Sequence, residues 1–361
     1  MGAMQIFKSI PVIDFAADAK SDLSTLSPQL IRAVRAACHR VGFFYAVNHG
    51  ITEPTLKELF SQMAHFFALP DSVKARLDKA NSPQFRGWER LGSELTNHEV
   101  DHREQVDIGK ERQALVNPQP FYRCLIGPNQ WPPETVAPHF KPAVEAMLEE
   151  FEHFARRVLG VMSASVGLAP EHIANVFGDD PQPYAKLITY PPTPANSNGV
   201  GAHKDSGFIT LLAQDEVGGL QAQNLDGQWI DVPPRKDALI VNVGELLQIL
   251  THNYFVATPH RVTNTSASTT RYSCAYFYSP DLDMSLEPLP LDESFKRAVG
   301  QSGAHANAKL MSSHAMLSRG EDGISGDVDA ERFGERYWQR WVRSYPGIAA
   351  KHHPQWVGET P

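Results

Sequence analysis

The stretch that decides the fold runs from residue 184 to residue 278, and at its centre stands Gly201-Ala202-His203-Lys204-Asp205-Ser206-Gly207. Short apolar runs alternate here with turn residues, among them Gly218-Gly219 and Asp226-Gly227. An Asp-Gly pair between two such runs is typical of a hairpin. Several short strands at this spacing predict an antiparallel sandwich or barrel, including the jelly-roll and cupin type. The expected strands are 186–190, 207–214, 220–223, 229–232, 238–243, 258–262 and 271–278.

His203 and Asp205 lie two positions apart in the central motif. Side chains alternate between the two faces of a strand, so both point to one face while Lys204 turns away. With a second imidazole they would form the 2-His-1-carboxylate site of non-heme Fe(II) oxygenases, which leaves one side of the metal open. His260 is our candidate for that ligand. Zinc is a rival metal, but its catalytic sites commonly use three His, or two His and a Glu.

Arg271 and Ser273 are also two positions apart on an expected strand and therefore share a face. A guanidinium binds a carboxylate through two parallel hydrogen bonds, and a serine hydroxyl beside it adds a further donor. Together they suit one end of a dicarboxylic acid, to which Tyr190 would add a phenolic hydrogen bond. The alternative for the Arg-x-Ser pair is an ordinary salt bridge on an edge strand.

Length and composition limit the class of protein. The chain has 361 residues, 42% of them hydrophobic, which is enough to bury a large core in one big domain or two closely joined ones. Its 33 Lys and Arg residues against 41 Asp and Glu give a formal charge of -8, and no dense basic run is present. This balance argues against nucleic acid and anionic membrane surfaces as partners, and favours a small-molecule substrate.

The cysteines and the apolar runs predict the compartment. Cys38, Cys124 and Cys274 form an odd and widely spaced set, which argues against a disulfide framework and for a reducing compartment. The N-terminus lacks the pattern of a signal peptide, and no run of about 18 apolar residues is present. We therefore expect a cytoplasmic protein without a membrane span.

Periodicity predicts the elements around this core. Ser27-Pro28 supplies an N-cap and a first-turn proline for a helix, and 53–67 and 138–166 read as two more amphipathic helices. Residues 10–15 and 41–47 read as strands, and 333–345 as a terminal helix that folds back over the site. The segment 81–133 is rich in Gly, Pro and polar residues, which predicts substrate-facing loops.

Taken in order, the motifs of this chain resemble those of the isopenicillin N synthase-like family of Fe(II)- and 2-oxoglutarate-dependent dioxygenases. The resemblance covers nearly the whole chain. It rests on Ile10-Pro11-Val12-Ile13-Asp14-Phe15, Gly42-Phe43-Phe44, Asn48-His49-Gly50, Gly127-Pro128-Asn129-Gln130-Trp131-Pro132, Tyr190-Pro191-Pro192, His203-Lys204-Asp205, Gly218-Gly219-Leu220-Gln221, Asn242-Val243-Gly244-Glu245, Pro259-His260-Arg261-Val262 and Arg271-Tyr272-Ser273.

The resemblance implies an α+β fold with a distorted double-stranded β-helix, a jelly-roll or cupin-like core flanked by helices. It implies that His203, Asp205 and His260 bind Fe(II), and that Arg271, Ser273 and Tyr190 grasp the distal carboxylate of 2-oxoglutarate. The implied reaction uses O2 to oxidise a small molecule by hydroxylation, desaturation or cyclisation, and releases succinate and CO2. We expect one compact unit, divided into an N-terminal α/β region (1–133), a long support helix (134–180), the dioxygenase core (181–285) and a C-terminal loop and capping helix (286–361).

Four residues are candidates for substrate contact. Arg86 resembles the substrate-carboxylate anchor of isopenicillin N synthase by its position in Phe85-Arg86-Gly87-Trp88, and with Trp88 it would contact an acidic or amino-acid-like molecule. A loop-stabilising ion pair is the alternative for Arg86. Ser206 lies near the expected cavity. Phe277 shares a face with Arg271 and Ser273, so it walls the cavity unless it is an ordinary core aromatic.

Two other functions remain open at the level of sequence. A 2-oxoglutarate-independent iron oxidase of the isopenicillin N synthase type uses its Arg-x-Ser pair for the substrate's own carboxylate. A non-catalytic cupin-like sensor would keep the barrel and the metal without turnover. The sequence does not name the substrate, and it leaves open whether the protein is a monomer or a small homo-oligomer.

Overall fold

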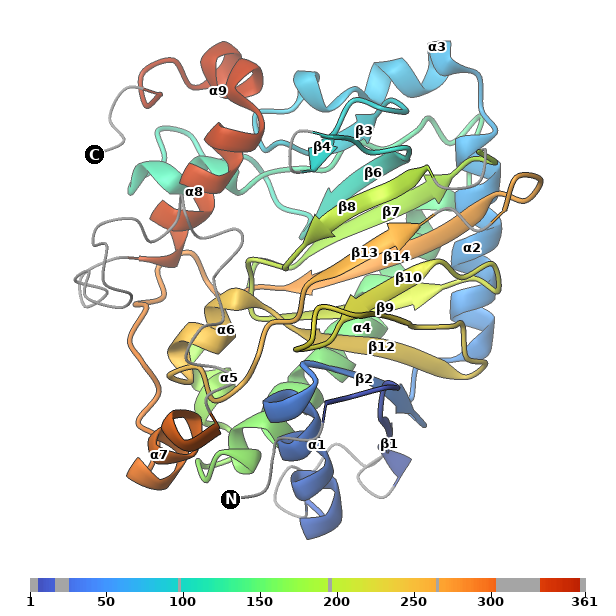
Figure 1. The fold of residues 1–361 in the computed structure, drawn as a ribbon. Coiled ribbons are helices and arrows are strands. Elements are labelled where there is room, and N and C mark those ends of the chain that lie inside the picture. Colours follow the sequence, from blue (N-terminus) through green and yellow to red (C-terminus); the bar gives the residue numbers. More distant parts are fainter. Residues whose placement is uncertain are drawn as a thin grey trace.

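The computed structural model describes residues 6–16, 26–96, 99–193, 197–263, 266–302 and 332–357. Two β-sheets face each other, and long helices cover the outer side of the larger sheet (Figure 1). This arrangement confirms the expected α+β fold with a jelly-roll core and flanking helices. The 303–331 part of the predicted C-terminal loop lies outside the described residues.

The larger sheet has eight strands in the order β1-β2-β12-β9-β14-β7-β6-β3. Its neighbours pair antiparallel except for β1 with β2. The strands are β1 Val12–Asp14, β2 Phe43–Val47, β3 Gly87–Glu89, β6 Glu104–Gly109, β7 Tyr184–Tyr190, β9 Ile209–Gln214, β12 Ala238–Val243 and β14 Arg271–Tyr278.

The smaller sheet has four strands in the order β11-β10-β13-β8. They are β8 Asn198–His203, β10 Leu220–Gln223, β11 Trp229–Asp231 and β13 His260–Thr263. Apolar side chains from both sheets, among them Val200, Ile240 and Val262, form a buried cluster between them. A two-stranded ribbon of β4 Leu95–Thr96 and β5 Glu99–Val100 lies beside β8, where Gly201 donates its N–H to Asp101.

A second and larger core lies between the eight-stranded sheet and the long helices α1 Pro28–Arg40, α2 Glu53–Phe67 and α4 Phe140–Ser165. The predicted N-cap of α1 is confirmed, because Ser27 Oγ accepts a hydrogen bond from the N–H of Leu30 at 3.1 Å. Along β14 the side chains alternate between this core and the space between the sheets. The remaining helices are α3 Asp71–Lys74, α5 His172–Val176, α6 Glu245–Leu250, α7 Glu293–Ser302, α8 Phe333–Ser344 and α9 Pro346–His352, with 3-10 turns at Ala75–Leu77, Lys79–Asn81 and Phe121–Leu125.

The segment 81–133 is more ordered than its composition predicts. It contributes β3 and β6 to the larger sheet, and β6 pairs along its whole length with β7. The expectation of loops throughout was wrong for β6, because the polar residues that made it look exposed are buried: Asp107 has no exposed surface and Gln105 only 1%.

The terminal helix confirms the predicted span of 333–345 to within one residue. Trp338 and Trp341 of α8 are buried, and α8 crosses the end of the sheets near β7 (Figure 1). Among the described residues, no helix is both long enough and apolar enough to cross a membrane.

Candidate metal centre and active site

Three potential ligands meet between the two sheets. His203 ends β8, Asp205 follows two residues later, and His260 begins β13, where it pairs directly with His203. One ligand atom from each residue lies within 4.8 Å of the other two. The Nε2 atoms of His203 and His260 lie 3.7 and 3.6 Å from Asp205 Oδ1. The structure thus brings together the three residues singled out as candidate ligands.

Neighbouring groups orient each ligand. Nδ1 of His203 lies 2.9 Å from Gly201 O, and Nδ1 of His260 lies 3.1 Å from Thr258 O. Because a carbonyl oxygen only accepts, each Nδ1 carries the proton and each Nε2 keeps a free lone pair. Such outer hydrogen bonds fix the tautomer and the ring orientation of metal-binding histidines.

The carboxylate of Asp205 is held in the same way. Its Oδ2 accepts hydrogen bonds from Thr210 Oγ1 at 2.6 Å and from Asn242 Nδ2 at 2.7 Å, both from the larger sheet. The other oxygen, Oδ1, is left to face the two imidazoles. Thr210 and Asn242 therefore tie the metal loop to the larger sheet, a role that the sequence reasoning missed although Asn242 stands in one of the quoted motifs.

The electrostatics of the cluster favour a cation. Burial, together with the neighbouring His260, lowers the pKa of His203 to about 4. Burial raises the pKa of Asp205, but the two histidines and the Thr210 and Asn242 hydrogen bonds outweigh it, so this pKa is lowered overall. At neutral pH Asp205 is thus ionised and His203 neutral. Two imidazole nitrogens and one carboxylate oxygen suit a divalent transition metal such as Fe(II).

The predicted carboxylate-binding group also comes together. Arg271 pairs with Tyr190 across β14 and β7, and its guanidinium carbon lies 4.7 Å from the centre of the Tyr190 ring. Arg271 Nη1 donates to Ser273 Oγ at 3.3 Å and Nη2 to Gln214 Oε1 at 3.0 Å, while its buried Nε has no hydrogen-bond partner among the described residues. A buried guanidinium without a carboxylate partner suits an anionic ligand.

One row of residues runs across the larger sheet beneath these groups. In register from β12 to β6 it consists of Asn242, Thr210, Phe277, Tyr184 and Gly109. The half-buried Phe277 thus lies between Thr210, which donates to Asp205, and Tyr184. Its ring centre is 6.1 Å from that of Tyr184. The half-buried Ser206 follows the metal ligand Asp205 directly. The row gives the site a floor that leads away from the metal ligands.

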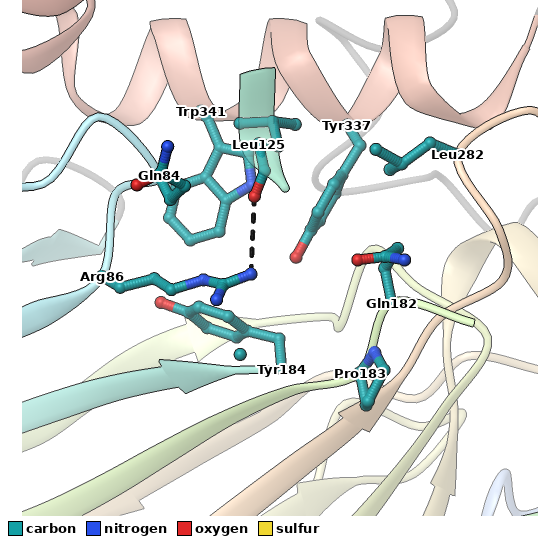
Figure 2. A pocket seen from close by; sticks show the side chains of 10 residues that line it. Gln84, Arg86, Leu125, Gln182, Pro183, Tyr184, Leu282, Tyr337 and Trp341 are labelled. Carbon is teal, nitrogen blue, oxygen red and sulfur yellow. Dashed lines mark hydrogen bonds between the residues drawn. The ribbon is translucent and has the colours of Figure 1, made fainter. Parts of the chain in front are cut away.

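Arg86 lies at the far end of this row. Its guanidinium rests against Gly109, where an added Cβ would come within 2.6 Å of the guanidinium carbon. Figure 2 shows it between the rings of Tyr184 and Trp341, beside a cavity of about 20 Å³ beneath α8. Nη1 donates to the carbonyls of Lys110 and Gly127 at 2.9 and 2.5 Å, and Nη2 donates to that of Leu125 at 3.4 Å.

The structure supports neither a loop-stabilising ion pair for Arg86 nor a place for Trp88 beside it. Among the described residues no carboxylate pairs with Arg86, so a loop-stabilising ion pair is not what holds it; backbone carbonyls do. Trp88 is 1% exposed in the core, and its Nε1 donates to Glu104 at 2.6 Å. The structure does not bring Trp88 to the Arg86 cavity.

A network of buried charges near the β6 and β7 edge was missed by the sequence reasoning. Lys186 Nζ lies 2.8 Å from Glu94, and Arg103 Nη2 lies 2.5 and 3.0 Å from Glu94 and Asp101. Lys79 Nζ lies 2.6 Å from Glu89 and also pairs with Asp107, and Tyr345 Oη joins the network at 2.8 Å from Lys79. The alternation of Gln105 and Asp107 with Val106 and Ile108 was the available signal for a strand here.

Comparison with protein families identifies the class. Residues 10–134 match the model of the non-haem dioxygenase in morphine synthesis N-terminal region, and residues 176–280 match the 2OG-Fe(II) oxygenase superfamily. The chain belongs to the Fe(II)- and 2-oxoglutarate-dependent dioxygenase family, as its motifs predicted. It is an enzyme that uses Fe(II), 2-oxoglutarate and O2 to oxidise a small molecule.

Individual relatives cover most of the chain. It is 32% identical over 310 residues to the 2-oxoglutarate-dependent dioxygenase frbJ of Dothideomycetidae sp., covering 84% of this chain and 83% of that protein. It is also 32% identical to homoarginine-6-hydroxylase 2-ODD-C23 of Glycine max, covering 86% and 99%. Among solved structures, a full-length Neurospora crassa protein in complex with alpha-KG and thymine superposes with a TM-score of 0.67 at 26% identity, covering 79% of this chain and 91% of that one.

Proposed function

We propose that His203, Asp205 and His260 are the Fe(II) ligands of this dioxygenase, and that Arg271, Ser273 and Tyr190 bind the distal carboxylate of 2-oxoglutarate. The observation that carries the proposal is the convergence of two unprotonated Nε2 atoms and one carboxylate oxygen within 4.8 Å. The buried guanidinium of Arg271 on the facing sheet has no carboxylate partner among the described residues and an unpaired Nε, which supports the second half.

Each group has a separate task in this proposal. Bound Fe(II) and 2-oxoglutarate supply the oxidation of the substrate by O2, with release of succinate and CO2. Thr210 and Asn242 hold the Asp205 carboxylate so that one oxygen stays directed at the metal position. Arg271 and Ser273 fix the far end of 2-oxoglutarate, and the buried surroundings of both groups strengthen these charged contacts by excluding water.

We also propose that Phe277, Ser206 and Arg86 line the substrate space. Phe277 and Arg86 stand on or against the row of residues that leads away from the metal ligands, and Ser206 is next to Asp205. The placement of Trp88 gives no support to its predicted substrate contact. The relatives include a homoarginine hydroxylase, and a substrate with a carboxylate fits the predicted acidic or amino-acid-like class.

We further propose the following domain division, oligomeric state and location. They are the division at residues 133, 180 and 285 within one compact unit, a monomer or small homo-oligomer, and a place in the cytoplasm. The three cysteines support the last, because all are free and buried and none forms a disulfide.

Anaerobic Fe(II) binding tests the ligand assignment. Wild-type protein is expected to hold one Fe(II) per chain, and His260→Ala and Asp205→Ala are expected to lose it, since each removes one of three protein ligands. His153→Ala, on the exposed side of α4, is the matched control and should bind as wild type. Unchanged iron content in both ligand variants would contradict the assignment.

A further inference from the structure

Arg340 of α8 is a guanidinium that the fold leaves without a polar partner among the described residues. Its carbon Cζ lies 4.8 Å from the centre of the Trp341 ring and 6.0 Å from that of Tyr337. Within the described part of the chain it has neither a hydrogen bond nor an ion pair, although it is half-buried. Ring contacts alone do not satisfy the donors of a guanidinium, so its N–H groups are available to a ligand.

Other buried cations near it are already engaged. Lys79, Arg103 and Lys186 form ion pairs with the four carboxylates of the buried network, Glu89, Glu94, Asp101 and Asp107. Arg86 donates to backbone carbonyls. The four carboxylates of this network therefore already have cationic partners, whereas no ion pair joins Arg340 to a carboxylate among the described residues.

Arg340 packs against the rings of Tyr337 and Trp341 of the same helix. Tyr337 and Trp341, on the same side of the helix, line the cavity beneath α8 (Figure 2), and Trp341 stands edge-on to Tyr184 of the sheet with ring centres 5.1 Å apart. Burial lowers the pKa of Arg340, but the neighbouring Tyr337, Tyr184, Tyr345 and Glu94 raise it overall, so the guanidinium stays charged. Those neighbours belong to α8, β7, the turn after α8 and the loop before β4.

The floor of the site leads from the metal ligands to Tyr184, which contacts Trp341 of α8. Thr210, which holds Asp205, is followed across the sheet by Phe277 and then by Tyr184. Adjacent strands lie about 4.8 Å apart, so Tyr184 stands about 10 Å across the sheet from Thr210. A molecule whose reacting carbon lies at the metal, and which follows this aromatic floor, brings its far end beneath α8.

We infer that Arg340 anchors a carboxylate at the end of the substrate remote from the reacting carbon. The inference rests on the proposed function and deepens it, because it names the substrate class and moves the anchor from Arg86 to Arg340. The substrate is then a carboxylic acid whose carboxylate lies about 10 Å or more from the oxidised carbon, by the strand spacing above.

Matched pairs of ligands test this inference. Aliphatic, aromatic and amino-acid carboxylates, each paired with its primary amide, are titrated anaerobically into the Fe(II) and 2-oxoglutarate-loaded protein, and binding is followed as a change in the visible band of the loaded centre. Succinate formation in air is measured for the same pairs. The acid should bind about 10- to 150-fold more tightly than its amide, the range expected for hydrogen bonds to a charged group.

Arg340→Gln should remove this preference for the acid, because it keeps a polar side chain and loses the charge. Arg343→Gln, on the exposed side of the same helix, is the control and should keep it. Equal binding of acids and amides by wild type, an unchanged preference in Arg340→Gln, or a panel in which no acid binds would each overturn the inference. Loss of the visible band itself would instead show that the proposed metal and 2-oxoglutarate site has failed.

Discussion

Replacing Arg271 with glutamine tests the proposed 2-oxoglutarate site in a way that leaves the metal ligands untouched. Arg271 is 3% exposed, and it presents charged donors beside Ser273 and Gln214. Glutamine keeps an amide but loses the charge. A hydrogen bond to a charged group contributes about 1.5–3 kcal/mol, and about 1.4 kcal/mol is a factor of ten in Kd. The Kd for 2-oxoglutarate should therefore rise about 10- to 150-fold.

Isothermal titration of the anaerobic Fe(II) protein with 2-oxoglutarate measures this change. Arg261→Gln is the matched control, because Arg261 neighbours His260 but turns outward and stacks on Trp229 at 4.1 Å. Its Kd for 2-oxoglutarate should stay at the wild-type value, and iron content should be unchanged in both variants. If Arg271→Gln binds 2-oxoglutarate as tightly as wild type, Arg271 does not bind the co-substrate and the proposed orientation is wrong.

Three further predictions concern the support of the site. Gly109→Ala should lower the free energy of unfolding, measured with urea, by about 1–3 kcal/mol, because its Cβ collides with the Arg86 guanidinium. Gly347→Ala is the control and should leave it unchanged, since an added Cβ there meets no atom within 4 Å. Lys79→Met should lower the free energy of unfolding by about 3–5 kcal/mol, because it leaves buried carboxylates unpaired. Lys141→Met, which breaks an exposed ion pair, should lower it by less than about 1 kcal/mol. Equal losses in the two variants would contradict the buried network. Burial raises the pKa of all three cysteine thiols, that of Cys124 to about 12. A thiol reagent at neutral pH should therefore label the cysteines only after denaturation, because the thiolate is the reactive form. Rapid labelling of the native protein would refute their burial.

The metal cluster was predictable because its signal is local. In an extended segment the His-x-Asp spacing places two side chains on one face, and Asp205 still meets His203 although β8 ends at His203; the alternation of Arg271, Ser273 and Phe277 does the same within β14. The long helices carried an equally direct signal, since their apolar stripes and the Ser27 cap depend only on positions within a few residues of each other.

The far end of the site was not predictable for the opposite reason. Lys79, Glu94, Arg103 and Tyr345 come from separate parts of the chain, and only the pairing of β3, β6 and β7 brings them together. Read one at a time, such polar residues resemble an exposed loop, as do Gln105 and Asp107, which is why β6 was missed. The availability of Arg340 is likewise visible only once the partners of its neighbours are known.

The visible spectrum of the anaerobic Fe(II) protein during titration with 2-oxoglutarate tests the central claim most directly. If two imidazoles and one carboxylate leave room on the metal, as at His203, Asp205 and His260, 2-oxoglutarate should chelate the iron and a weak charge-transfer band should grow to saturation at one equivalent per chain. Iron that stays bound while no band develops would contradict the assignment of this site as a 2-oxoglutarate-dependent oxygenase centre.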